Sequence, residues 1–260
     1  MEDEKYNIKS ISRCLKILDM TVGSDFPLSI KDVCSALDIN TNMAFRMLST
    51  LVSAGYMEKD GKTGLYSNSL KTLQLSRNAL LSLNIRKFAM PYLELLWNQC
   101  SKANVNLALL YEGEVLVIDR LDSNSTPRTY FTLGKTSPFH CTALGKILTC
   151  ELDKNELDKI ISKKGLKAFT PQTITDPSKF KKELEKVRAE QIARDREEYI
   201  PNDNCNAAPI RNQEGKISAA VSLSAFDSYM TLQEMEETIP ALRNIAQRIS
   251  FAAGYQYGLA

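Results

Sequence analysis

The segment from Thr41 to Ser53 carries polar side chains spaced so that they lie on one face of an α-helix. The polar row, at i, i+4, i+7 and i+11, is Asn42, Arg46, Ser49 and Ser53, and the apolar Phe45 lies on the same face at i+3. The apolar row on the other face is Ala44, Met47, Leu48 and Leu51. An Asn amide can pair with an adenine edge, and an Arg guanidinium can bind a guanine edge or a phosphate. The pattern therefore fits a helix that reads DNA, or an ordinary amphipathic helix whose polar face is solvated.

The segments around this helix favour DNA contact. Ser29 and Asp32 have the spacing of a capping box for a helix that ends near Leu37, with Asp in place of the usual Glu. Three residues, Asp38 to Asn40, then lead into the next helix, and so short a turn predicts a helix-turn-helix. Two short strands, 56–59 and 65–67, flank a turn rich in Gly and Lys and complete a winged helix. The predicted DNA contacts are Thr41, Asn42, Met43, Phe45, Arg46, Lys59 and Lys62.

The predicted contacts have different chemistry. The N-terminal residues of a recognition helix reach base edges in the major groove, which suits Asn42 and Arg46. Phe45 either touches thymine methyl groups or packs against a neighbour. Lys59 and Lys62 on the wing are expected to bind phosphates. Residues 1–90 hold 12 basic and 9 acidic side chains, a balance that permits DNA binding without arguing for it.

Catalytic and metal-binding patterns are weak. His140 and Cys141 are adjacent, but neighbours in sequence rarely aim their side chains at each other, and His140 is the only histidine. The six cysteines are scattered without the spacing of a zinc site. The pair Glu197 and Glu198 resembles a solvated or salt-bridged surface more than an acid–base pair. No phosphate-binding glycine motif is present, so nucleotide-dependent chemistry is not indicated. From these patterns together, no cofactor and no metal is expected.

The remaining chain predicts a mixture of helices and antiparallel strands. An apolar stripe of Ile11, Cys14, Leu15, Leu18 and Val22 predicts a first helix. Residues 70–100 predict two helical pieces, with a kink or a new turn at Pro91. Hairpins are expected around Glu112-Gly113 and around 212–215, and a long final helix is expected to be capped by Thr231 and Glu234. This pattern indicates a two-domain protein: an N-terminal winged helix-turn-helix and a C-terminal α+β domain.

The sequence also bears on location. No run of eighteen apolar residues predicts a membrane span. The first ten residues are polar and acidic, which argues against a secretory signal. Several cysteines have apolar neighbours, as expected of reduced, buried thiols in a cytoplasmic protein.

The predicted strand "AAVSLSA" has one apolar face and one face of small and hydroxylated side chains. Ala220, Ser222 and Ser224 alternate with apolar residues, so they share one side of the strand. That side could line a ligand pocket, face solvent, or pack under a helix.

The motifs together resemble the IclR family of bacterial transcriptional regulators. "SISRCLKILD", "PLSIKDVCSALDI" and "RMLSTLVSAGY" are similar to its winged helix. "FHCTALGKIL", "GLKAFTPQTITDP" and "CNAAPI" with "AAVSLS" are similar to its effector domain. The sequence departs from the family at Gln191, where Gly is usual.

The resemblance implies a winged helix over residues 1–69, a connecting helix over 70–84 and a GAF-like effector-binding domain over 85–260. It also implies homodimers or homotetramers that bind double-stranded operator DNA near metabolic genes. The residues that it places at the effector site are Ala143, Leu144, Asp195, Cys205, Ser222 and Ser224.

Two functions follow as hypotheses. The first is a ligand-responsive transcriptional repressor without turnover, whose effector is a small hydroxylated acid or a carboxylate. The alternative is an enzyme that acts on a small acid through Cys141 or Cys205.

Overall fold

The computed structural model describes residues 7–22, 26–123 and 132–256. Residues 1–6, on which the argument about a secretory signal partly rests, lie outside this set. The chain forms two compact units that meet between Ser82 and Leu83. No helix in the described ranges has the length and apolarity that crossing a bilayer requires. All six cysteines are free, and Cys141, Cys150 and Cys205 are buried, as predicted.

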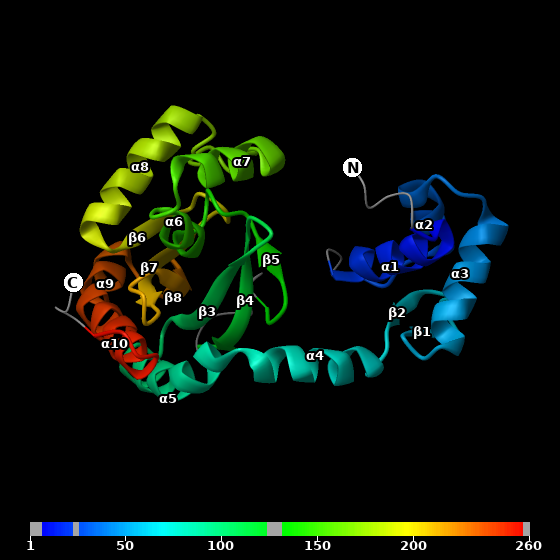
Figure 1. Cartoon of the computed structure of the whole chain (residues 1–260), viewed down its shortest axis with the longest axis horizontal. Coiled ribbons are helices and arrows are strands. Elements are labelled where there is room, and N and C mark those ends of the chain that lie inside the picture. The colour runs from blue at the N-terminus through cyan, green and yellow to red at the C-terminus, as the bar shows by residue number, and fades with distance from the viewer. Residues whose placement is uncertain (1–6, 23–25, 124–131, 257–260) are drawn as a thin grey trace. The chain divides into compact units, whose positions relative to one another are not determined.

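The first unit is a winged helix (Figure 1). Its helices are α1 (Lys9–Val22), α2 (Ile30–Leu37), α3 (Thr41–Ser53) and α4 (Lys71–Ser82), and its wing is β1 (Met57–Lys59) and β2 (Tyr66–Asn68). The capping box forms as predicted, because the Ser29 hydroxyl accepts from Asp32 N while the Asp32 carboxylate accepts from Ser29 N. Asn40 caps α3 by accepting from Met43 N at 2.9 Å. These local bonds fix where α2 and α3 begin.

The first helix forms as predicted, but no side chain of its apolar stripe is fully buried. Ile17 is the fully buried side chain of this helix, whereas Ile11, Leu15 and Val22 are exposed. The sequence of α1 is apolar on more than one side, so periodicity alone does not identify the side that packs on α2 and α3.

The second unit is built on a six-stranded sheet in the order β5-β4-β3-β8-β7-β6, with every neighbouring pair antiparallel. Its strands are β3 (Asn104–Tyr111), β4 (Glu114–Leu121), β5 (Thr136–Ser137), β6 (Ala193–Arg196), β7 (Asp203–Arg211) and β8 (Ile217–Phe226). Both predicted hairpins form, β3–β4 and β7–β8. The predicted two-domain fold class is therefore confirmed.

Helices cover both faces of the sheet (Figure 1). On one face lie α5 (Asn84–Gln99), α9 (Leu232–Glu237) and α10 (Ile239–Ala252); on the other lie α6 (Ala143–Thr149), α7 (Lys154–Lys164) and α8 (Pro177–Glu190). Helix α5 runs without a break through Pro91. The single long final helix is wrong: it divides at Thr238, because Pro240 lacks the N–H that would continue the helical bonding. Helix α7 was not predicted.

Gly145 lets α6 approach the segment that precedes it. A Cβ at this position would lie 2.1 Å from the carbonyl oxygen of Phe139, a contact that only backbone movement could relieve. Thr142 caps the helix by accepting from Gly145 N at 3.1 Å. The close approach holds α6 against the sheet face that carries the polar residues described below.

Candidate functional site

The polar row of α3 is available for contact. Thr41, Asn42, Phe45 and Arg46 are exposed, while the apolar row Ala44, Met47, Leu48 and Leu51 is buried as predicted. The Arg46 guanidinium forms no ion pair with any described carboxylate. Helix α3 therefore presents an amide and a free cation near its N-terminus, the groups that a base-reading helix needs.

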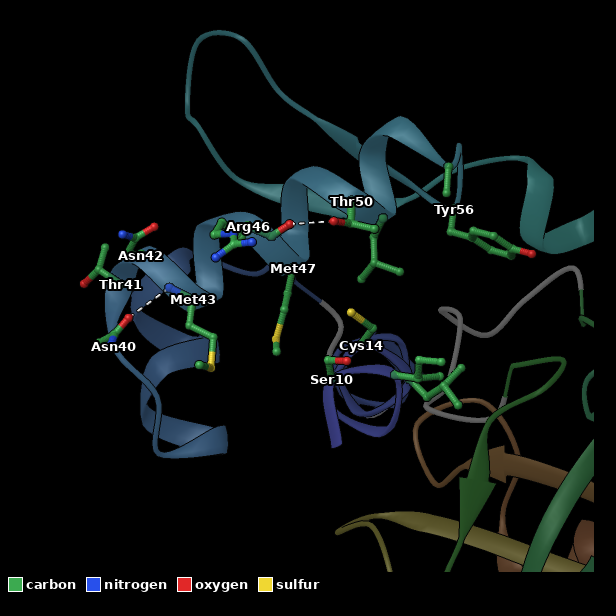
Figure 2. Close-up of a pocket in the computed structure, with 14 residues that line it drawn as sticks. Ser10, Cys14, Asn40, Thr41, Asn42, Met43, Arg46, Met47, Thr50 and Tyr56 are labelled. Carbon is green, nitrogen blue, oxygen red and sulfur yellow. Dashed lines mark hydrogen bonds between the residues drawn. The ribbon is translucent and has the colours of Figure 1, made fainter. Parts of the chain in front are cut away.

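Met43 and Phe45 are both partly exposed, but Met43 is oriented toward α1. Its sulfur accepts from the Arg13 guanidinium at 3.3 Å. Met43 also lines a hollow of about 910 Å³ between α1 and α3, which Met47 and Cys14 border from opposite helices (Figure 2). The predicted role of Met43 in DNA contact remains untested, and its position favours a role in orienting α3 on α1.

The wing lysines lie on a turn that one aspartate organises. Asp60 Oδ1 accepts from Lys62 N at 3.0 Å and from Thr63 N at 2.6 Å. Lys59 and Lys62 are both exposed, and the Lys59 ammonium lies 5.5 Å from the centre of the Tyr66 ring. An ordered turn with two exposed ammonium groups suits contact with phosphates rather than reading of bases.

The second group of predicted residues comes together on the face of the sheet beneath α6. Strand register places Asp195, Cys205, Ser224 and Asn104 in one row across β6, β7, β8 and β3. The next row on this face is Ala193, Ala207, Ser222, Asn106 and Arg120. Ala143 and Leu144 of α6 belong to the same buried cluster as Cys205. We call these two rows the polar face.

The two serines of the polar face are fully buried, so the alternative in which they face solvent is wrong. The amide of Asn106 donates to the Ser222 hydroxyl at 3.3 Å and to the Ser224 hydroxyl at 3.4 Å. Arg120 Nη1 in turn donates to Asn106 Oδ1 at 2.9 Å. Asn106 and Arg120 escaped the sequence analysis, because their place beside the serines depends on register between distant strands.

Several buried atoms of this region lack hydrogen-bond partners among the described residues. They include Arg120 Nη2, Asp203 Oδ1 and Glu198 Oε2. Asp203 is two residues before Cys205 on β7, so it lies on the same side of the sheet. Leaving such groups unsatisfied costs about 1–3 kcal/mol each, so this region is suited to receive polar groups from a ligand.

Two carboxyl groups of this region, those of Asp195 and Asp203, have raised pKa values. Burial and the nearby Glu198 raise the pKa of Asp195 well above its usual value. Burial raises the pKa of Asp203 to about 7, against an opposing effect of Arg120. The raised pKa of Asp195 favours its neutral form, which weakens the repulsion that a carboxylate would exert on an anionic ligand.

A buried lysine supports this region from α6. Lys146 is almost fully buried, and its ammonium donates to Glu198 Oε1, to Arg194 O at 2.9 Å and to Glu183 Oε1 at 3.3 Å. Glu198 N donates to Asp195 Oδ1 at 2.8 Å, which fixes the Asp195 carboxyl. Glu198 is thus salt-bridged, as one interpretation of the Glu197-Glu198 pair predicted, but it is buried rather than on the surface.

The structure offers no support for a nucleophilic cysteine. His140 Nε2 lies 3.0 Å from Lys167 O, an arrangement in which this nitrogen donates, and burial lowers the pKa of the ring. Burial, together with Asp195 and Glu198, raises the pKa of the Cys141 thiol, and burial raises that of Cys205. A reactive cysteine needs the opposite shift, toward the thiolate. Among the described residues, no group of three His, Cys, Asp or Glu side chains could hold a metal ion.

Comparison with known proteins identifies the family. Residues 77–251 match the family described as bacterial transcriptional regulator IclR C-terminal, and residues 10–61 match the IclR helix-turn-helix domain. The chain belongs to the IclR family. It is accordingly a ligand-responsive, DNA-binding transcriptional regulator.

Individual IclR-family relatives match along nearly the whole chain. The transcriptional regulator KdgR of Escherichia coli K12 is 26% identical over 95% of this chain and 94% of its own. The repressor AllR of the same strain is 29% identical over 95% and 90%. The crystal structure of Thermotoga maritima IclR superposes with a TM-score of 0.73 at 26% identity, covering 96% of this chain and 100% of that one. An IclR homologue from Microbacterium hydrocarbonoxydans, solved with 4-hydroxybenzoate, shares the fold with a TM-score of 0.79 at 22% identity over 94% and 98%.

The first prediction concerns Asp203 in this IclR-family protein. Because its folded pKa of about 7 lies above the pKa of about 3.9 that an aspartate has in an unfolded chain, the folded state holds a proton that the unfolded state releases. This contribution to stability is present at low pH and is lost as pH rises toward 7. Asp203→Asn removes the titration, so its unfolding free energy relative to the wild type should increase by roughly 2–3 kcal/mol between pH 5 and pH 8. Urea unfolding at both pH values measures this difference, and parallel pH profiles would contradict it.

Proposed function

We propose that this regulator is a cytoplasmic repressor of a metabolic operon that binds a two-fold operator as a dimer or a larger assembly. A small hydroxylated acid that binds at the polar face is proposed to control the affinity of the regulator for operator DNA. The observation that carries the proposal is the chemistry of the polar face, which buries the hydroxyls of Ser222 and Ser224. Arg120 Nη2 on this face, and Asp203 Oδ1 on the same side of the sheet, lack partners among the described residues.

The effector class follows from charge and hydrogen bonding. Arg120 Nη2 suits a ligand carboxylate, because a guanidinium binds this group with charge-assisted bonds. Ser222 and Ser224 can each donate and accept a bond with a ligand hydroxyl. The Asp195 carboxyl, whose pKa is raised by burial, would add a further donor in its protonated form. The 4-hydroxybenzoate bound by the Microbacterium homologue is a carboxylate that also carries a hydroxyl group, which supports the same class here.

The dimer is supported by apolar side chains that the single chain leaves in solvent. On α1 and just before it, Ile8, Ile11, Leu15 and Val22 are more than half exposed, with fractions of 62, 53, 55 and 54%. Helix α4 buries none of its residues, and Leu73 and Leu81 are 64 and 62% exposed. Twelve residues of isolated helix are marginal in water, so α4 needs a partner surface. A second copy of this chain would supply it.

Substitution of the exposed leucines tests the assembly. Leu73→Glu/Leu81→Glu should convert the protein to a monomer at micromolar concentration and weaken operator binding, because charges would enter the proposed interface. Gln74→Glu, an exposed polar position on the same helix, is the matched control and should leave the assembly intact. Light scattering after size exclusion gives the mass. A wild-type monomer, or a double variant that remains oligomeric, would count against this interface.

The role of Arg46 is tested on DNA from the region beside the protein's own gene. Arg46→Ala should weaken binding to the operator by about 1–3 kcal/mol if the guanidinium reads a base edge. A mobility-shift titration on the operator and on a scrambled duplex separates the possibilities. An equal loss on both duplexes would show that Arg46 contacts only phosphate.

The polar face is tested by removing its two hydroxyl groups. Ser222→Ala/Ser224→Ala should weaken effector binding by about 10–30-fold, since two hydrogen bonds contribute about 1 kcal/mol each. Operator affinity without effector should not change. The control is Ser218→Ala, at a serine near the start of the same strand β8. Calorimetry with pairs such as 4-hydroxybenzoate and benzoate identifies the ligand class first. Normal release of DNA by the double variant would place the effector elsewhere.

A further inference from the structure

Arg13 is a cation of the first unit whose guanidinium is only weakly engaged by the fold. It belongs to the segment "SISRCLKILD" and lies on α1, where it donates to the sulfur of Met43 at 3.3 Å. A guanidinium has five N–H donors, and a thioether sulfur is a weak acceptor. Arg13 forms no ion pair with a carboxylate in the described part of the chain. Most of its hydrogen-bonding capacity is therefore left for another partner.

The bond to Met43 fixes where this guanidinium lies. Met43 is the third residue of α3, in the turn that begins the proposed reading helix. Arg46 follows Met43 by three residues, a spacing that makes two side chains neighbours on a helix surface. Figure 2 shows Asn42, Met43 and Arg46 at the N-terminal end of α3. Arg13 therefore lies beside the end of α3 that carries the predicted base contacts, although it comes from a different helix of the same unit.

Two guanidinium groups thus lie near the Met43 side chain without a carboxylate to neutralise them. Asp19, the acidic residue of α1, is six residues from Arg13 and so lies on a different side of that helix. Asp32 is used in the capping box of α2. Like charges repel, and the positive dipole end of α3 adds to the local potential. The surface around Met43 therefore favours an anion.

The position of Arg13 suits a DNA phosphate better than a base. Base edges are reached by the N-terminal residues of the recognition helix itself, whereas the phosphates border the groove that this helix enters. Arg13 stands on a second helix beside that end of α3, where it would meet the border of the groove. A guanidinium also binds a phosphate by two parallel charge-assisted bonds, which fixes the protein on the duplex without reading its sequence.

We propose that Arg13 binds a phosphate of the DNA backbone beside the base edges that α3 reads, and that Met43 is a positioning residue that orients the Arg13 guanidinium. The proposal rests on the proposed contact of α3 with DNA and uses residues of the first unit alone. It gives Met43 an indirect role in place of a base contact.

The first test measures binding to a duplex of unrelated sequence over a range of salt concentrations. Arg13→Gln should make the slope of log affinity against log salt shallower by about 0.9 for each bound chain, since one phosphate contact is lost. Arg13→Met, which keeps an apolar side chain, should give the same change, and Arg13→Lys, which keeps the charge, should retain the wild-type slope. Lys216→Gln removes one charge between β7 and β8 and should behave as the wild type.

The second test separates positioning by Met43 from packing. Met43→Leu keeps an apolar side chain of similar volume but removes the sulfur acceptor. It should weaken binding about 2–5-fold in the wild type, as expected for one hydrogen bond, and should have no further effect in the Arg13→Gln background. An equal loss in both backgrounds would show that Met43 packs or contacts DNA itself, and would overturn its positioning role.

Two results would overturn the phosphate contact. An unchanged slope for Arg13→Gln and Arg13→Met, with circular dichroism as in the wild type, would show that Arg13 only joins α1 to α3. An equal change of slope for Lys216→Gln would reveal a general effect of net charge. The unrelated duplex requires neither an operator nor base recognition, so these failures are distinct from a failure of sequence-specific binding by α3.

Discussion

The structure of the second unit depends on the cost of burying polar groups. One face of its sheet packs apolar side chains against α5 and α10, as an ordinary core does. The other face buries serines, asparagines and carboxyls under α6. Such groups cost free energy unless they are hydrogen-bonded, and a domain with so large an apolar core could have avoided them. Their retention at one place, with some atoms unpartnered among the described residues, is what distinguishes a binding face from a packing face.

The supports of the polar face come from elements that are distant in sequence. Lys146 reaches from α6 to the Glu198 carboxylate and the backbone of β6, so a single buried cation holds the residue whose backbone N–H donates to Asp195. On the opposite edge, Asp119 and Arg120 are neighbours on β4 and point to opposite faces. Arg120 donates to Asn106, while Asp119 pairs with Arg86 of α5 at 2.7 Å. One strand thus touches both the polar face and the helix that follows the connector α4.

Local chemistry made much of this architecture predictable. The capping boxes at Ser29 and Thr231 and the Glu112-Gly113 turn each depend on residues a few positions apart, and each forms as predicted. The DNA-facing row of α3 was predictable for the same reason, since one helix carries both rows. Asn106, Arg120 and Lys146 were not, because strand register and the depth of α6 are properties of the assembled sheet. Helix α7 was not predicted although Leu157, Ile160 and Ile161 have helical spacing and Asp153 caps its start, so the same local chemistry could have found it.

Gln191 shows how an unfavourable backbone position can be offset by side-chain bonding. It ends α8 with φ of 54°, a left-handed conformation that glycine adopts readily and that costs other residues roughly 1 kcal/mol. The glycine usual in the resembled family is therefore the residue that the backbone alone would select. Gln191 instead donates to Arg188 O at 2.8 Å and to Glu151 Oε1 at 3.2 Å, and its own Oε1 accepts from Arg211 Nη2 at 2.6 Å. Since Arg211 also binds Glu151, the side chain joins the ends of α6 and α8 to β7. A glycine would relax the backbone but lose these bonds, so the two effects on the stability of the fold have opposite signs at this position.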